Sequence, residues 1–270
     1  MRREPITAPF LLQDREEDYQ LAIQLFKMIL RFMNDVDLSA LQEITLGNYI
    51  IQTGIDSPTI RDEIYCQLVN QTHQNPKRLN AERGWILLAA CASVFPPSSQ
   101  LLKYILNYVT TSNNEQQGNY SGSVQIRNLV QAKLLQAYHC EGTATRHAPP
   151  TLLEWAVIIQ KADLALDITC SDGESVPCQV ESWMTANDLA QRVLKQKGIK
   201  ANSGWTVGLS APNTEYLVSG SDYVLDILSH WEHPQACSPI KPPCLVAYRT
   251  DGFLRPPPPL YQQSRGRFSG

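Results

Sequence analysis

The chain has 270 residues, enough for one large domain or two modest ones, and its hydrophobic fraction of 43% is typical of a soluble globular protein. The formal net charge is −3 and neither half of the chain is strongly basic, which argues against a nucleic-acid partner. The sequence contains no apolar run long enough to cross a bilayer and no apolar signal core near its start, so neither a transmembrane segment nor a secretory leader is expected.

The cysteine pattern predicts reduced thiols in a cytoplasmic protein. There are seven cysteines, an odd number, and no two of them form a C-x-x-C pair. Several lie within apolar stretches, as is usual for buried thiols in a reducing compartment. No cluster has the short spacing that a zinc site needs, so no metal is expected.

The first half of the chain is predicted to form helices. Residues 15–33 carry apolar residues at three- and four-residue steps, which is typical of an amphipathic helix, and a second helix is expected around residues 38–51. Ser57-Pro58 predicts the start of a third helix, with the serine as N-cap and the proline in the first helical position. The buried stripe of that helix should contain Ile60, Ile64, Tyr65 and Leu68.

A fourth predicted helix, residues 83–94, is apolar on nearly all sides and therefore belongs in the middle of a bundle. Pro96-Pro97-Ser98 ends this helix and caps the next one. The polar residues 110–123 are predicted to form a surface loop, and a last helix follows with an apolar face from Ile126 to Tyr138. The first half is therefore expected to be an all-helical bundle.

From Leu164 the hydrophobic period changes from 3.6 to 2, which predicts strands. The expected order is strand, strand, helix, strand, strand, short helix, strand, which is the order of a ubiquitin-like β-grasp over residues 160–250. Pro177 falls within the second strand, a position compatible with the edge of a sheet. The run Pro256-Pro257-Pro258-Pro259 predicts an extended, disordered tail over residues 252–270.

The segment between the two halves is apolar, unlike an ordinary polar linker. Leu152, Leu153 and Trp155 are therefore expected to pack between the halves and to dock them rigidly.

No residue constellation predicts catalysis. Arg61-Asp62-Glu63 lies in the first turns of a helix between two isoleucines, where charges usually cap or pair. His139 and Cys140 are neighbours in a helix and point in different directions. No glycine-rich loop ends in the lysine that a phosphate site needs. The chain is expected to have neither a catalytic residue nor a cofactor.

Long ordered motifs in the first half resemble a known family. Residues 56–68, Asp-Ser-Pro-Thr-Ile-Arg-Asp-Glu-Ile-Tyr-Cys-Gln-Leu, are similar to the central signature of the myosin tail homology 4 (MyTH4) domain. Asn75-Pro76, Arg83-Gly84-Trp85 and Phe95-Pro96-Pro97-Ser98 follow at the family's spacing, and the resemblance covers residues 5–155. One departure is Asn34, where the family usually has glycine.

The second half resembles the first, ubiquitin-like lobe of a FERM domain. Residues 222–226, Asp-Tyr-Val-Leu-Asp, are similar to the short-helix motif of that lobe. The resemblance implies an α+β protein, a helical MyTH4 bundle followed by a β-grasp lobe. This pair occurs in unconventional myosins of the seventh, tenth and fifteenth classes, of which the fifteenth is favoured here. A complete FERM domain has three lobes, and this chain holds at most one.

The resemblance also implies a function, that of a non-catalytic module that binds cargo in a myosin tail. The expected partner is an acidic or amphipathic segment of a cytosolic cargo or scaffold protein, and the alternatives are tubulin or an autoinhibitory contact with the motor domain. The parent protein would be an actin-activated ATPase in actin-based protrusions such as stereocilia or microvilli. The residues expected to contact a partner are Lys77, Arg78, Arg83, Arg127 and Lys133.

Overall fold

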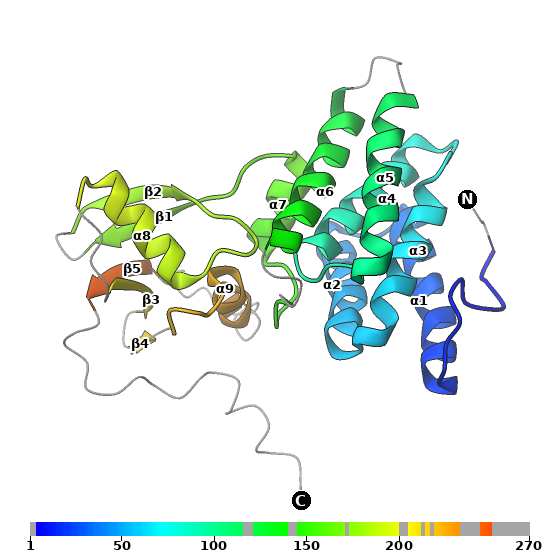
Figure 1. Ribbon diagram of the computed structural model, residues 1–270, viewed down its shortest axis with the longest axis horizontal. Helices are drawn as coiled ribbons and strands as arrows, with labels where there is room; N and C mark the ends of the chain where they lie inside the picture. The colour runs from blue at the N-terminus through cyan, green and yellow to red at the C-terminus, as the bar shows by residue number, and fades with distance from the viewer. Residues whose placement is uncertain are drawn as a thin grey trace, which may run out of the picture. The chain divides into compact units, whose positions relative to one another are not determined.

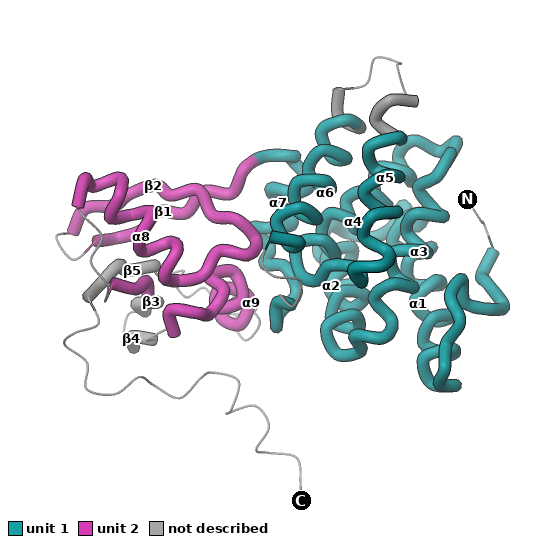
Figure 2. The backbone as a smooth tube through the Cα atoms, viewed as in Figure 1, with its two compact units in different colours: residues 1–162 teal, residues 163–270 magenta. Residues whose placement is uncertain are grey.

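The chain divides into two compact units, residues 1–162 and residues 163–270 (Figure 2). The first unit is helical and the second is built on a β-sheet (Figure 1). The predicted tail, residues 252–270, lies outside the described part of the chain. The computed structural model describes residues 4–115, 121–139, 145–170, 173–199, 205–211, 214–216, 219–232 and 244–249.

The first unit contains seven named α-helices and one 3₁₀ turn in its described residues. The third predicted helix is preceded by that turn, because Pro58 opens a 3₁₀ segment and the side chain of Ser57 makes no capping hydrogen bond. The elements are α1 (Glu16–Asn34), α2 (Ala40–Asp56), η1 (Pro58–Ile60), α3 (Arg61–Thr72), α4 (Arg78–Ala92), α5 (Ser99–Glu115), α6 (Ser121–His139) and α7 (Leu152–Gln160).

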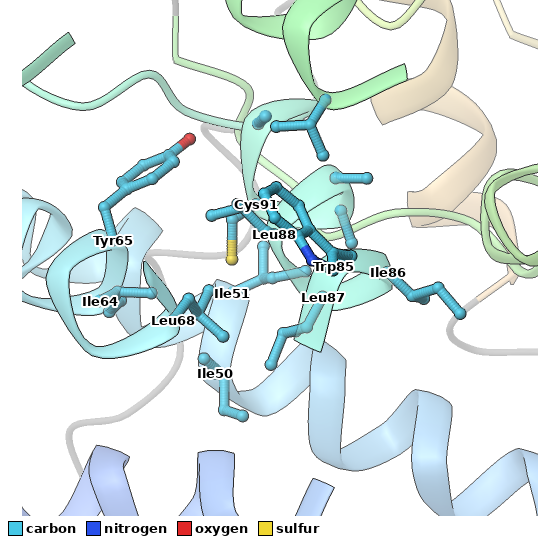
Figure 3. Close-up of a cluster of buried hydrophobic side chains, with 14 of the residues drawn as sticks. Ile50, Ile51, Ile64, Tyr65, Leu68, Trp85, Ile86, Leu87, Leu88 and Cys91 are labelled. Atoms are coloured by element: carbon cyan, nitrogen blue, oxygen red, sulfur yellow. The ribbon is translucent and has the colours of Figure 1, made fainter. Parts of the chain in front are cut away.

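Helix α4 lies in the centre of the bundle, as its uniformly apolar sequence predicts. Every residue from Gly84 to Ala92 is buried, and α4 contacts α1, α2, α3, α6 and α7 (Figure 3). Gly84 permits the close approach of α1 and α3, since a Cβ atom there would lie 2.7 Å from both Met33 Cε and Thr72 Cγ2. A larger side chain at this position would therefore require the Met33 and Thr72 side chains, or the helices themselves, to shift.

The polar stretch 110–123 is less of a loop than its composition predicts. Helix α5 continues to Glu115 and α6 begins at Ser121, so residues 116–120 are the part that lies outside the described residues. Thr110 fits inside the helix because its hydroxyl donates to the carbonyl of Leu106, one turn earlier, at 2.9 Å. Polar residues can thus extend a helix beyond the last buried position, Val109.

The second unit contains a five-stranded sheet of order β2-β1-β5-β3-β4. β1 and β5 are parallel at the centre, and the other neighbours are antiparallel. This is a β-grasp arrangement, as predicted, and Pro177 lies opposite Asp167 on the edge strand β2. The bounds are β1 (Ala165–Cys170), β2 (Ser175–Gln179), α8 (Ala186–Gln196), β3 (Trp205–Ala211), β4 (Thr214–Tyr216), α9 (Val224–Glu232) and β5 (Cys244–Arg249).

Helix α8 supplies much of the core of this unit. A capping box starts it, since the Thr185 hydroxyl accepts from the backbone N–H of Asp188 while the Asp188 carboxylate accepts from the backbone N–H of Thr185. The helix contacts β2 and β3. Its buried face consists of Ala186, Leu189, Ala190, Val193 and Leu194.

Candidate partner-binding surface

The five basic residues predicted to contact a partner have different surroundings. Lys77 and Arg78 are exposed at the start of α4, and Lys133 is half-buried on α6. Arg83 is half-buried one turn into α4. Arg127 is only 2% exposed. The five therefore do not form one exposed basic surface, and Lys77 and Arg78 are the adjacent pair that a partner could reach.

Arg83 joins α4 to the connection between α1 and α2. Its Nε donates to Glu43 Oε1 at 3.0 Å, and its Nη1 donates to the backbone carbonyl of Asp35 at 2.7 Å. The guanidinium also lies 5.7 Å from the centre of the Phe32 ring. These contacts use two of the five N–H donors of the side chain for structure.

Arg127 lies inside the bundle beside aromatic rings. Its guanidinium is 5.8 Å from the centre of the Trp85 ring, and that ring stacks on Tyr108 with centroids 5.4 Å apart. Burial lowers the pKa of Arg127, although an arginine remains charged at any physiological pH. A cation–π contact of this kind stabilises the packing of α4, α5 and α6.

Three aliphatic side chains in the connection after α1 and in the first turns of α2 and α4 are exposed, a feature that the sequence analysis missed. Val36 is 85% exposed, Leu41 64% and Leu79 74%. Val36 stands outside any helical apolar stripe, between Asp35 and Asp37, and that isolation was the available signal.

Polar contacts join the end of α1, the first turn of α2 and the start of α4. Asn80, next to Leu79, hydrogen-bonds to Asn34 at the end of α1. Arg83, one turn after Leu79, holds Asp35, which precedes Val36. The same Arg83 pairs with Glu43, in the first turn of α2. These contacts hold the three segments together.

The charged triplet Arg61-Asp62-Glu63 connects distant segments. Arg61 donates to the carbonyl of Gly54 at 2.7 Å and to the Thr145 hydroxyl at 2.9 Å. Asp62 accepts from the backbone N–H of Ser98, just before α5, at 2.7 Å. Glu63 is fully buried and accepts the backbone N–H groups of residues 10 and 11 at 2.9 and 2.8 Å. These contacts give all three residues structural roles.

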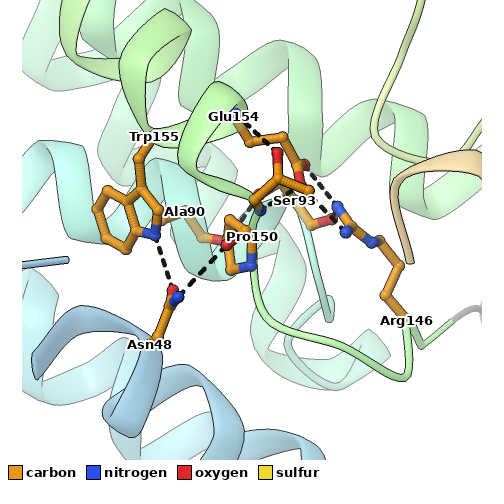
Figure 4. A network of polar contacts seen from close by, with 8 residues as sticks. Asn48, Ala90, Ser93, Arg146, Pro150, Glu154 and Trp155 are labelled. Carbon is orange, nitrogen blue, oxygen red and sulfur yellow. Dashed lines mark hydrogen bonds and ion pairs between the residues drawn. The ribbon is translucent and has the colours of Figure 1, made fainter. Parts of the chain in front are cut away.

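Trp155 packs into the helical bundle. Its indole lies 6.1 Å from the Phe32 ring, and its Nε1 donates to Asn48 Oδ1 at 2.7 Å (Figure 4). Trp155 is thus a residue of the bundle core, and its predicted role in packing between the two halves stays a prediction. Leu152 and Leu153 are exposed, and the rigid docking of the halves stays a prediction.

The segment that carries Trp155 is a helix rather than a linker. Thr151 and Glu154 form a capping box at its start: the Thr151 hydroxyl accepts from the Glu154 N–H at 2.9 Å, and the Glu154 carboxylate accepts from the Thr151 N–H at 3.0 Å. The T-x-x-E spacing was present in the sequence and was the signal that could have predicted α7.

A buried ion pair holds the segment before α7. Both Nη atoms of Arg146 contact the Glu154 carboxylate, at 2.5 and 3.1 Å, and the two side chains are only 0% and 3% exposed (Figure 4). The backbone N–H of Arg146 also donates to the carbonyl of Val94 at 2.9 Å. This arrangement ties residues 145–154 to the end of α4.

Two thiols of the bundle, Cys66 and Cys91, are poor nucleophiles. Burial, together with Glu63 and Asp62, raises the pKa of Cys66 to about 11, and burial raises the pKa of Cys91 further. Among the described residues, no three His, Cys, Asp or Glu side chains come together as a metal would require. Across the same part of the chain, no helix combines the length and apolarity needed to cross a membrane.

Comparison with known families agrees with this architecture. Residues 47–157 match the MyTH4 domain, and residues 162–241 match the RA like domain. The chain therefore carries a MyTH4 domain followed by an RA like lobe of the FERM type, and the resemblance to an unconventional myosin tail is confirmed. Both are non-catalytic modules of myosin tails.

The curated proteins that the chain resembles include several unconventional myosins. The chain is 40% identical over 233 residues to human unconventional myosin-XV, covering 84% of this chain and 6% of that protein. It is 34% identical to human unconventional myosin-XVB, covering 85% of this chain and 7% of that protein. The chain thus spans a small part of the curated relatives that it matches.

Solved structures share the fold over about half of their own length. The Dictyostelium discoideum myosin VII MyTH4-FERM MF1 domain has a TM-score of 0.83 at 23% identity, covering 94% of this chain and 52% of that one. The C-terminal MyTH4-FERM domain of human myosin 7b, solved in complex with the harmonin-a PDZ3 domain, has a TM-score of 0.76 at 20% identity, with coverage of 92% and 51%.

Proposed function

We propose that this chain is a protein-recognition module of an unconventional, actin-based myosin tail, where it binds a cargo or scaffold protein. The observation that carries the proposal is the 40% identity to human unconventional myosin-XV over 84% of the chain. The human myosin 7b MyTH4-FERM domain was solved with a PDZ domain bound, which supports a protein partner for this chain as well.

The proposed partner is a cytosolic protein that contributes an acidic or amphipathic segment. Such a segment would become ordered on a preformed surface of the bundle. Charge complementarity between the surface and the segment would determine which segments bind. Of the predicted contact residues, Lys77 and Arg78 are exposed for this role, while Arg83 and Arg127 support the helices from within. The parent protein would be an actin-activated ATPase that acts in stereocilia or microvilli.

A quantitative pulldown tests the proposal. The 270-residue chain would serve as bait in epithelial lysate, compared with a Lys77→Glu/Arg78→Glu variant. Arg83 is left unchanged because its reversal would break the contacts to Asp35 and Glu43. The matched control, Lys27→Glu/Lys103→Glu, makes the same charge change at two other exposed lysines.

Reproducible protein partners that are lost with the first variant and kept with the control are the expected result. Partners that bind the wild type, both variants and a heat-unfolded sample equally would refute specific recognition.

Two other roles are distinguishable by separate assays. Direct tubulin binding predicts co-sedimentation with microtubules that weakens as salt is added, because exposed charges are screened. An autoinhibitory role predicts that the chain, added in trans, slows the ATPase of the motor domain. The exposed Lys77-Arg78 pair is compatible with either role, and its reversal should abolish the effect in both assays.

A further inference from the structure

Residues 5–13, which we call the strap, lie against the bundle without forming a helix or a strand of their own (Figure 1). Pro5 and Pro9 have no backbone N–H to give to such an element. At the exposed side of the strap, the Tyr19 hydroxyl donates to the carbonyl of Thr7 at 3.0 Å. The strap is therefore held by contacts with the helices rather than by internal structure.

Two apolar side chains of the strap pack on α1. Ile6 is only 3% exposed and packs with Phe26 and Leu30, and Ile23 borders the same cluster. The Phe10 ring lies 6.1 Å from the Phe26 ring. This cluster is separate from the main core of the bundle, as is common beneath a long loop. The strap thus covers a face of α1 without taking part in the main core.

A buried carboxylate of α3 binds the backbone of the strap. The two oxygens of Glu63 accept the successive N–H groups of Phe10 and Leu11, at 2.9 and 2.8 Å. The bundle itself positions this carboxylate, since Gln67 Nε2 donates both to Glu63 Oε1 and to the carbonyl of Ala22 in α1, each at 2.9 Å. Glu63 is therefore a preorganised, charged acceptor for two neighbouring backbone N–H groups.

The residues that join the strap to α1 are largely exposed. Leu12 is 95% exposed, and Asp14 and Arg15 are exposed as well. Arg15 is the N-cap residue of α1, and its side chain makes no capping hydrogen bond. The strap can therefore move about this join without breaking a side-chain cap of the helix.

We propose that Ile23, Phe26, Leu30 and Glu63 form a binding site for an extended apolar segment, which we call the strap site. The strap occupies this site in cis and can leave it while the bundle stays folded. The segment that fits the site carries two apolar side chains four residues apart and offers two successive backbone N–H groups to Glu63. The inference goes beyond the proposed cargo-binding function and does not depend on it, because the ligand is a segment of the chain itself.

A dye-labelled synthetic peptide with the sequence of residues 4–13 tests the proposal by fluorescence anisotropy. Its partner is the full 270-residue chain with Ile6→Ser/Phe10→Ser, in which the strap has lost its apolar contacts. The peptide is expected to bind this variant at least about tenfold more tightly than the wild type, where the strap in cis competes at high effective concentration. In methyl NMR of the variant, the peptide should shift the signals of Ile23 and Leu30.

Further variants locate the binding. Leu12→Ser, at an exposed position, should leave the strap in place and the peptide affinity equal to that of the wild type. Adding Glu63→Gln to the Ile6→Ser/Phe10→Ser chain should weaken the peptide by about tenfold or more, because an amide NH₂ replaces one of the two acceptor oxygens. A peptide with serine in place of its isoleucine and phenylalanine should bind at least about tenfold more weakly than the original peptide.

Circular dichroism during thermal unfolding shows whether the bundle stays folded without its strap. The Ile6→Ser/Phe10→Ser chain should keep the helical content of the wild type and a cooperative transition. Loss of the fold in this variant would overturn the inference, because the strap would then be an integral part of the core. Equal peptide affinity for the wild type and the variant, an affinity that ignores Glu63→Gln, or shifts confined to other methyl groups would each overturn it as well.

Discussion

Arginine has a different role at each of several positions in the bundle, according to how much water reaches its side chain. Arg78 is exposed, Arg83 joins two corners of the bundle, Arg127 lies over an indole, and Arg146 pairs with a buried carboxylate. The sequence shows the same residue type each time. The role of each arginine depends on the residues, distant in the sequence, that pack against it. For this reason Arg127 was predicted as a surface residue, and the Arg146–Glu154 pair was not predicted.

Removing the carboxylate of Glu154 should destabilise the first unit strongly. Glu154→Gln keeps the shape of the side chain but leaves the buried guanidinium of Arg146 without its counter-charge. We expect a loss of about 3–5 kcal/mol in the free energy of unfolding, measured by urea denaturation with circular dichroism. Arg146→Met combined with Glu154→Gln should lose less than Glu154→Gln alone.

The control is Glu17→Gln, which removes an exposed partner of Arg15 and should change stability by no more than about 0.5 kcal/mol. A double variant that is as unstable as the single Glu154→Gln variant would show that the unpaired charge is not the cause.

Cys66 should resist alkylation. Its pKa is raised to about 11, so at neutral pH it holds roughly a hundredfold less reactive thiolate than a cysteine of ordinary pKa. We expect slow modification by iodoacetamide, with a rate that rises as the pH approaches about 11. Peptide mapping measures this, with the denatured chain as reference. A rate that reaches its plateau near pH 9 would contradict the raised pKa.

At the scale of elements, hydrophobic periodicity predicted the helices and strands that pack on one face. Capping and turn residues predicted fewer of the positions at which these elements begin and end. The all-round apolar sequence of α4 and the alternation of β1 were sufficient to place both elements. Helix α7 was missed because its apolar run was interpreted as a linker, although its T-x-x-E start was visible. The contacts of Arg83 depend on the meeting of α1, α2 and α4, which local pattern does not encode.

The packing of α2 against α7 depends on a small residue. A Cβ atom at Gly47 would lie 2.6 Å from Trp155 Cη2 and 3.2 Å from Phe32 Cε2. Since both are rigid rings in the core, Gly47→Ala should cost about 1–3 kcal/mol in the free energy of unfolding. Thr45→Ala, at an exposed position of the same helix, should stay within about 0.5 kcal/mol. Equal stability of the two variants in thermal and urea unfolding would show that α7 can shift to make room.

At the scale of the whole molecule, each unit has its own buried core. The residue at which the first unit ends therefore determines whether a fragment contains the whole core of the bundle. The predicted MyTH4 boundary at residue 155 falls inside α7, whose buried Ile158 belongs to the core cluster of the bundle. Lys161, beyond the helix, pairs with Glu82 of α4 at 2.5 Å. We therefore place the functional end of the bundle near residue 162, where the first compact unit ends.

Two fragments test this limit. A fragment of residues 1–162 should unfold cooperatively, and a fragment of residues 1–155 should be less stable, because loss of a buried isoleucine alone costs about 2–5 kcal/mol. Circular dichroism during thermal unfolding measures the difference. In the longer fragment, Ile158→Ala should reproduce much of the loss, while Ile159→Ala, at an exposed position, should not. Equal melting temperatures for the two fragments would place the end of the bundle at residue 155.

The proline in β2 limits how the second unit could meet other polypeptides. Pro177 has no N–H, so the free side of this outermost strand lacks a donor that an added strand would need. Extension of the sheet by backbone pairing is thereby discouraged at this edge. A ligand that binds by strand addition would have to use the opposite border, β4, and side-by-side self-association through β2 is disfavoured by the same missing donor.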